Sequence, residues 1–301
     1  MTGTARLAAV LLLVAAALAG PTEATARPTS LNIDSSFGSG KFGRWEPDRW
    51  GLPSYRYRID EETNPIARQA ILAGSTDAWH QLGNDRFVAT AYNHGYVKLW
   101  TQDRRYEWLN RYDPENRHFS GGFGYLNVDG KIISSLYDDR PAGTRVQRRF
   151  GTGYSRSSLE SRGISIDQHL YAPFGDDPLL IHQVTLRNKS RQPKTASWFE
   201  YWDVNPFDQG ENDQVGLGRP EASDGGRTLR VDQTPDIKDN TQSIFAAALT
   251  GQVTGYETRA SAFFGKGGRP TPDAVKANRL GNGIADAVPD GQVGSTMFAF
   301  R

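Results

Sequence analysis

Short runs in which apolar and polar residues alternate recur along the chain from Pro53 onward, and turn residues separate them. In residues 163–172, Ile164, Ile166 and Leu170 fall on one face of an extended chain and polar residues on the other. Alternation with a period of two is typical of half-buried strands, so these runs predict β-strands. Further strands are predicted at residues 54–59, 86–92, 95–101, 124–128, 131–137, 179–187, 194–203, 228–233, 243–249 and 261–264. In the run 179–187, the residues expected to face inward are Leu180, Val184 and Leu186.

Turn residues between the runs predict hairpins. Asp129-Gly130 is the strongest short hairpin signal in the chain, because Gly readily adopts the positive φ that such turns require. Asn93-His94-Gly95 is a second hairpin connection. The best helical stripe covers only residues 65–73. Many strands at roughly ten-residue spacing, with few helices, predict an all-β fold built as a sandwich or a barrel.

The chain divides into three parts. Arg6 precedes a continuous apolar run of thirteen residues, Leu7 to Ala19, and small-x-small cleavage sites follow. The run is shorter than the roughly 20 residues that cross a bilayer. A cleaved signal peptide at residues 1–26 is therefore favoured over a membrane anchor, and the protein is expected to be secreted. Residues 27–52 are expected to form an entry arm. Residues 53–301 are expected to form the β-sandwich domain, incomplete at its C-terminus because the sequence stops inside a strand-like run.

Composition narrows the classes of function. Lys and Arg number 35 and Asp and Glu 34, a net charge of +1 that does not favour nucleic acid or an anionic membrane surface as partner. The absence of cysteine excludes thiol chemistry, Cys-based zinc sites and iron–sulfur clusters. None of the five histidines has metal-ligand spacing, and His182 is expected to be a hydrogen-bonded core residue. The Gly-x-Gly-x-x-Gly match at residues 38–43 lacks the flanking strand and helix of a dinucleotide site, so no metal or cofactor is expected.

Asp176 and Asp177, adjacent in a Gly-Asp-Asp-Pro stretch, are candidate acids for a sugar-processing enzyme. Neighbours on an extended strand point to opposite faces, whereas the two acids of a glycosidase flank one bond at about 5–9.5 Å from each other. The pair falls between two predicted strands, 163–172 and 179–187. It is therefore expected to turn the chain, and no catalytic residue is predicted.

Aromatic residues supply candidate sugar contacts. Trp198, Glu200 and Trp202 share one face of a predicted strand, where indoles can stack on sugar rings and a carboxylate can bond hydroxyls. The alternative is that the same row fills the core between two sheets. Tyr96 and Trp100, near the Asn-His-Gly turn and hence near a sheet end, are two further candidates for carbohydrate binding.

An ordered series of motifs over roughly residues 75–301 resembles a known family. The series is Asn93-His-Gly-Tyr96, Trp108-Leu-Asn-Arg111-Tyr112, Phe150-Gly-Thr-Gly-Tyr154-Ser-Arg156, Gly163-Ile164, Ala172-Pro-Phe-Gly-Asp-Asp-Pro178, Val184-Thr-Leu-Arg-Asn188-Lys-Ser190 and Phe199-Glu-Tyr-Trp202. In order and spacing it resembles the N-terminal sandwich domain of family 94 glycoside phosphorylases, such as cellobiose and chitobiose phosphorylases. It also resembles the related domains of cyclic β-1,2-glucan synthase.

This resemblance implies a many-stranded antiparallel super-sandwich of the galactose-mutarotase-like type. In the family a helical barrel follows and carries the catalytic Asp, and no residue of this chain matches that acid. The resemblance thus implies a domain that binds an oligo- or polysaccharide, with a β-linked glucan as the expected ligand. Export is expected from the signal peptide, which is a departure from the best-known phosphorylases of the family. The alternatives are a glycoside phosphorylase, glycosyltransferase or hydrolase as part of a longer product, and a structural module for homodimer or domain contacts.

Overall fold

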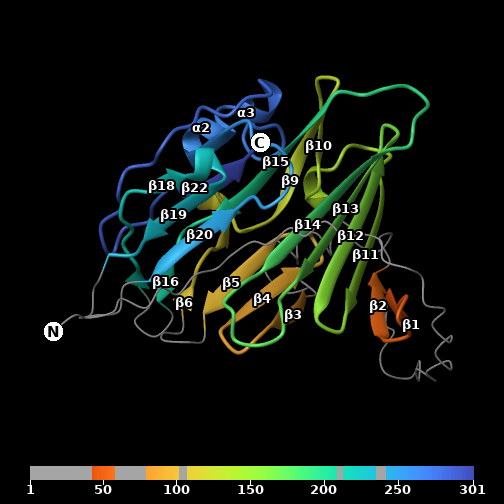
Figure 1. Cartoon of the computed structure of the whole chain (residues 1–301), viewed down its shortest axis with the longest axis horizontal. Coiled ribbons are helices and arrows are strands. Elements are labelled where there is room, and N and C mark those ends of the chain that lie inside the picture. The colour runs from red at the N-terminus through yellow and green to blue at the C-terminus, as the bar shows by residue number, and fades with distance from the viewer. Residues whose placement is uncertain (1–42, 58–78, 102–106, 209–212, 235–241) are drawn as a thin grey trace.

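The computed structural model describes residues 43–57, 79–101, 107–208, 213–234 and 242–301, and β-strands are their main regular elements (Figure 1). The predicted signal peptide at residues 1–26 and the helical stripe at residues 65–73 lie outside the described residues. No helix in the described ranges is long and apolar enough to cross a bilayer. The predicted all-β class is confirmed.

The strands of the described residues form three large antiparallel sheets and two small ones. The first sheet has the order β1 (Gly43–Pro47), β2 (Pro53–Tyr57), β11 (Arg145–Gly151), β12 (Tyr154–Ser161), β13 (Ile164–Tyr171) and β14 (Ile181–Asn188). The second has the order β10 (Lys131–Ser134), β9 (Gly121–Val128), β15 (Ala196–Asp203), β22 (Thr296–Phe300) and β21 (Tyr256–Arg259). The third has the order β17 (Asp213–Gln214), β16 (Phe207–Asp208), β6 (Glu107–Trp108), β5 (Val97–Thr101), β4 (Phe87–Tyr92) and β3 (Trp79–Gly83). Strand β1, at the edge of the first sheet, falls within the segment expected to be an entry arm and pairs with β2.

The small sheets and short helices lie between these strands in the sequence. One small sheet has the order β18 (Glu221–Ser223), β19 (Thr228–Asp232) and β20 (Ser243–Ala247), and the other pairs β7 (Tyr112–Asp113) with β8 (His118–Phe119). The helices within the described ranges are η2 (Pro114–Asn116), η3 (Tyr137–Asp139), η4 (Asp224–Gly226), α2 (Ala260–Phe264) and α3 (Asp273–Lys276). None of them extends beyond five residues.

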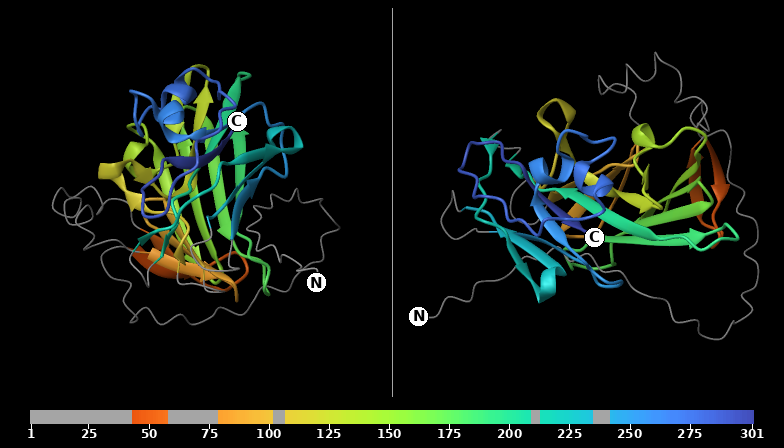
Figure 2. Two further views of the ribbon diagram at one scale, coloured as in Figure 1. Left: turned by 90° about the vertical axis from the view of Figure 1, so that its left-hand side faces the viewer. Right: turned by 90° about the horizontal axis from the view of Figure 1, so that it is seen from above.

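The hydrophobic cores lie on both faces of the second sheet. In the main core, side chains from the three large sheets and the three-stranded sheet meet, among them Phe87, Phe150, Leu170, Trp202, Leu229 and Phe298. An aromatic core lies on the opposite face, where α2 and α3 cover the sheet, and includes Phe123, Tyr125, Phe199, Tyr201 and Phe263 (Figure 2). Burial on both faces explains why every residue of β9 and of β22 is buried.

The predicted hairpins and the clearest predicted strand are confirmed. β9 pairs with β10 around Asp129 and Gly130, whose φ angles of 50° and 76° are both left-handed. A Cβ on Gly130 would meet nothing within 4 Å, so the backbone conformation, and not lack of space, favours glycine there. β4 pairs with β5 across the second predicted turn. Along β13, buried and half-buried residues alternate strictly, as the pattern predicts.

The strand predicted at residues 261–264 is wrong, because these residues belong to the helix α2. The buried residues of α2 are Ala260, Phe263 and Phe264, a spacing of i, i+3 and i+4 that fits one face of a helix. The segment is too short for its periodicity to separate helix from strand. Packing of both Phe rings against the aromatic core decides in favour of the helix.

Leu186 lies on the expected inward face, opposite the buried Ile166, but its side chain is 38% exposed, so it is not part of the core. β14 is an edge strand, and its burial fades from Ile181, which is buried, to Asn188, which is exposed. The nearest core packs against Val184 and against no later residue of this strand. An alternating pattern gives the face of a side chain but not how far along the strand the opposing layer extends.

Asp176 and Asp177 lie in the loop between β13 and β14, in agreement with the predicted turn. Gly175 has a φ of 111°, a conformation that side chains with a Cβ rarely adopt. The side-chain amide of Asn84 holds the loop by donating to the carbonyl oxygens of Pro173, at 3.3 Å, and Asp177, at 2.5 Å.

Stability at acidic pH is expected to depend on His80, which stacks on Phe150 with the ring centroids 5.4 Å apart and thereby joins β3 to β11. Burial lowers the pKa of His80 below its usual value, and a hydrogen bond with the Gly151 backbone only partly opposes this shift. On acidification the unfolded chain takes up a proton near pH 6.5, before the folded protein does. The stabilisation present above this pH is therefore lost as the pH falls through the lower, folded-state pKa.

Urea unfolding of the wild type and of His80→Phe at pH 7 and pH 5 measures this effect. The wild type is expected to lose more of its free energy of unfolding between the two pH values than the variant, which keeps a stacked ring but cannot titrate. Equal losses in the two proteins would contradict this role of His80.

Candidate functional site

The Trp198–Glu200–Trp202 row lies on β15, where alternate residues point to the same face. Trp202 is only 4% exposed and belongs to the main core, whereas Trp198 is half-buried. Glu200, between them, is 9% exposed. The row therefore runs from the core, at Trp202, toward a more open end, at Trp198.

The carboxylate of Glu200 is the centre of this row. Trp202 donates from its Nε1 to Oε1 at 2.7 Å, and Trp198 donates from its Nε1 to Oε2 at 2.8 Å. On the neighbouring sheet, His182 places its Nδ1 2.6 Å from Oε1. His182 is thus the hydrogen-bonded core histidine that was predicted from its place on β14. A carboxylate offers about four lone-pair sites, so three contacts leave roughly one acceptor site, on Oε2.

Two glycines of β9 provide the space for the indoles. A Cβ on Gly121 would come within 2.3 Å of the Trp202 ring, and one on Gly124 within 2.4 Å of the Trp198 ring. Gly124 is also the cross-strand partner of Glu200. The rings of β15 consequently lie over bare backbone of β9, which fixes their rotamers and holds both N–H groups toward the carboxylate.

A cavity of about 410 Å³ opens at this row. Its walls include Trp198, Glu200 and His182, residues 246–248 and 250–254 at the end of β20 and in the following loop, and Arg301. Arg301 is fixed by hydrogen bonds from NH2 to the Ser197 hydroxyl at 3.0 Å and from NH1 to the Thr254 hydroxyl at 2.7 Å. The cavity thus offers an aromatic wall, a carboxylate oxygen and a guanidinium.

Comparison with known proteins identifies the domain. The model of the glycosyl hydrolase 94 supersandwich domain matches residues 72–290, most of the chain. The chain belongs to this family. The match confirms the resemblance that the motif series indicates, and it assigns the sheets to a supersandwich domain that is related to carbohydrates. A comparison with curated proteins finds no match.

The other two predicted sugar contacts of the supersandwich domain lie elsewhere. Tyr96 is 4% exposed and lies in the aromatic core, stacked between Tyr92 at 4.4 Å and Tyr112 at 3.9 Å between ring centroids. Trp100 is half-buried and meets Trp108 edge-to-face at 5.9 Å. Neither residue lines the cavity at the Glu200 row, so the five predicted residues do not form one site.

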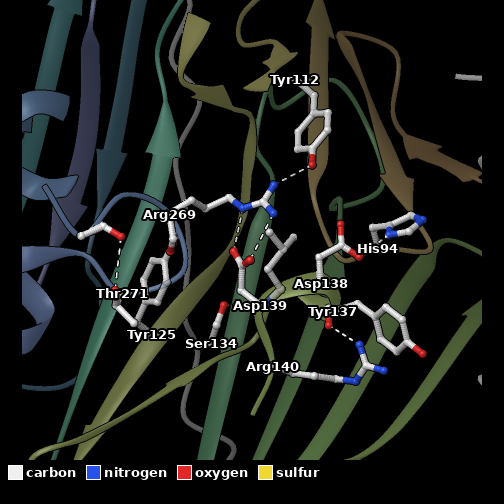
Figure 3. A network of polar contacts seen from close by, with 12 residues as sticks. His94, Tyr112, Tyr125, Ser134, Tyr137, Asp138, Asp139, Arg140, Arg269 and Thr271 are labelled. Atoms are coloured by element: carbon white, nitrogen blue, oxygen red, sulfur yellow. Dashed lines mark hydrogen bonds and ion pairs between the residues drawn. The ribbon is translucent and has the colours of Figure 1, made fainter. Parts of the chain in front are cut away.

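A second polar network joins the loop between α2 and α3 to the strands (Figure 3). Arg269 donates from Nε to Asp139 at 2.6 Å, from NH2 to the other oxygen of the same carboxylate at 3.1 Å, and from NH1 to the Tyr112 hydroxyl at 2.8 Å. The neighbouring Asp138 lies 3.1 Å from Nδ1 of His94. Each carboxylate of this Asp pair is thus bound to a cation or an imidazole, an arrangement that connects chain segments. Sequence reasoning missed the network because Arg269 is 130 residues away from Asp139.

Across the described ranges, no three His, Asp or Glu side chains gather closely enough to hold a metal ion. A buried pair joins β8 to the end of β15: Nδ1 of His118 lies 2.9 Å from Oδ1 of Asp203. Burial raises the pKa of Asp203, and the His118 hydrogen bond opposes this shift.

Proposed function

We propose that this supersandwich domain binds a carbohydrate chain in the cavity beside β15, with a β-linked glucan as the ligand class. One observation carries the proposal: the half-buried indole of Trp198 and the carboxylate of Glu200 face the same cavity of about 410 Å³. A sugar ring has an apolar face that stacks on an aromatic ring and hydroxyls at its edge that donate to an acceptor. The remaining acceptor site on Oε2 suits such a hydroxyl.

Binding is favoured over catalysis at this cavity. Cleavage of a glycosidic bond commonly uses two carboxyl groups on opposite sides of the bond. Among the described residues that line the cavity, Glu200 is the only acidic one. Its oxygens already accept hydrogen bonds from two indole N–H groups, which can only donate. We therefore assign Glu200 to ligand and ring positioning, and no catalytic step to this domain.

Export is the second part of the proposal. The apolar run of residues 7–19, with Arg6 before it and small residues after it, supports a cleaved signal peptide. A secreted supersandwich domain would meet polysaccharide outside the cell. The ligand class itself is supported by the family and by the cavity, independently of where the protein acts.

Trp198→Ala is expected to weaken binding of a β-linked gluco-oligosaccharide by about tenfold, because one ring-stacking contact of about 1–1.5 kcal/mol is lost. Isothermal titration calorimetry and tryptophan fluorescence, on chains that show wild-type unfolding midpoints, measure the affinity. Trp198→Phe keeps a ring but loses the N–H donor to Glu200 and should lie between alanine and wild type. Trp79→Ala is the matched control, since Trp79 is 53% exposed and lies outside this cavity.

Two results would count against glucan binding at this place. Wild-type protein that gives neither heat nor a fluorescence change with millimolar oligosaccharide would favour a structural role for the domain. If Trp198→Ala kept its fold and bound the oligosaccharide with unchanged affinity, the binding site would have to lie away from β15.

A further inference from the structure

The outer face of the first sheet carries a row of basic residues. Strand register places Arg56 of β2 opposite Arg149 of β11, Arg149 opposite Arg156 of β12, and Arg156 opposite His169 of β13. These strands lie side by side (Figure 1). Like charges directly opposite each other in an antiparallel sheet are destabilising. The stability of the fold therefore does not explain this row.

The row lies in a groove with a volume of about 820 Å³. The arginines that line it and are not buried are Arg49, Arg56, Arg149, Arg156 and Arg187, against two aspartates. Arg148 also borders the groove but is only 4% exposed. The net charge of the whole chain is only +1, so positive charge is concentrated here. A groove lined by charges of one sign focuses the electrostatic potential and attracts ligands of the opposite sign.

Acidic residues neutralise only part of this charge. Glu46 pairs with Arg149, and Asp167 pairs with Arg156, with Oδ1 2.9 Å from Nε. Within the described residues, the ion pairs of the groove involve Arg149 and Arg156, and none joins Arg56 or Arg187 to a carboxylate. The pKa of His169 is lowered, first by burial and then by the positive charges of Arg156 and Arg49, which indicates that positive charge prevails in the groove.

We propose that this groove binds an anionic polysaccharide that carries carboxylate groups. Guanidinium groups bind planar carboxylates in a bidentate manner. From β2 to β14 the sheet spans four strand spacings, roughly 19 Å, which exceeds a single small anion and suits several sugar units. The Trp50 side chain, 48% exposed at the rim and 5.7 Å edge-to-face from Tyr154, adds a ring on which a sugar can stack.

The saccharide class follows from the carbohydrate-related family together with this exposed indole. The site is separate from the β15 cavity, since no residue lines both. Glucan binding at Trp198 and binding of an acidic polysaccharide at the groove can therefore fail or succeed independently.

The test uses the whole chain and an oligogalacturonate as probe, titrated by calorimetry at low and at physiological salt. The double variant Arg56→Gln/Arg187→Gln removes two charges of the groove and is expected to bind at least about tenfold more weakly than wild type, since charge-assisted contacts are lost. Arg56→Lys/Arg187→Lys should recover part of this loss. Lys266→Gln/Lys276→Gln is the matched control, because it removes the same charge from exposed positions outside the groove.

Wild-type affinity should fall as salt rises, because salt screens exposed charges. A neutral gluco-oligosaccharide should be insensitive to the groove substitutions. The proposal would be overturned by equal affinity in wild type and Arg56→Gln/Arg187→Gln at matched unfolding midpoints. It would also be overturned if an oligodeoxynucleotide of equal charge bound more tightly than the oligogalacturonate, or if inorganic phosphate alone bound as tightly.

Discussion

Glu200→Ala is expected to lower the free energy of unfolding by about 3–5 kcal/mol. The substitution removes the shared acceptor of Trp198 Nε1, Trp202 Nε1 and His182 Nδ1. A buried donor left without an acceptor costs about 1–3 kcal/mol, and the deleted side chain leaves a space beside the core. Urea unfolding followed by circular dichroism, with linear extrapolation to water, measures the change.

Two further variants make this prediction specific. Glu200→Gln keeps the shape but replaces one acceptor oxygen by an NH2 group that faces a donor, so its loss should be smaller, about 1–3 kcal/mol. Glu221→Ala, at an exposed position of β18, should change stability by no more than about 0.5 kcal/mol. If Glu200→Ala were as mild as Glu221→Ala, the carboxylate would not be the centre that holds both indoles.

Local patterns in the sequence predicted much of the fold. The β13 alternation and the Asp129-Gly130 hairpin depend only on neighbours in the chain, and both are confirmed. The one-face arrangement of Trp198, Glu200 and Trp202 is likewise confirmed, because it needs only the period of a strand. The residues that the row faces could not be predicted.

Contacts between distant segments account for the rest of the site. Gly121 and Gly124 look like ordinary strand breakers in the sequence, and their role emerges only when β9 pairs with β15. In the same way Arg56, Arg149 and Arg156 are scattered along the chain and become one row through strand register. The net charge near zero gave no indication of that row, because composition does not show where charged residues lie in the fold.

Arg269→Met is expected to lower the free energy of unfolding by about 3–5 kcal/mol, because it removes one partner of a buried ion pair. The carboxylate of Asp139 is only 5% exposed and would lose both hydrogen bonds from this guanidinium (Figure 3). The loop itself should stay in place, since Tyr125 donates from its hydroxyl to the backbone carbonyl of Arg269 at 2.8 Å, a bond that methionine retains. The loss of free energy of unfolding would therefore result from removal of the Arg269 charge and not from displacement of the loop.

A double-mutant cycle with Asp139→Asn separates the ion pair from packing. Asp139→Asn alone leaves the Arg269 guanidinium, 18% exposed, with the neutral amide and the Tyr112 hydroxyl as partners. With both residues neutral no buried charge is left unpaired, so Arg269→Met/Asp139→Asn should be less destabilised than the sum of the single variants. Urea unfolding of the four proteins gives the coupling energy. Simple additivity would show that Arg269 contributes through its aliphatic stem and Tyr112, and that the clamp between η3 and the α2–α3 loop does not depend on charge.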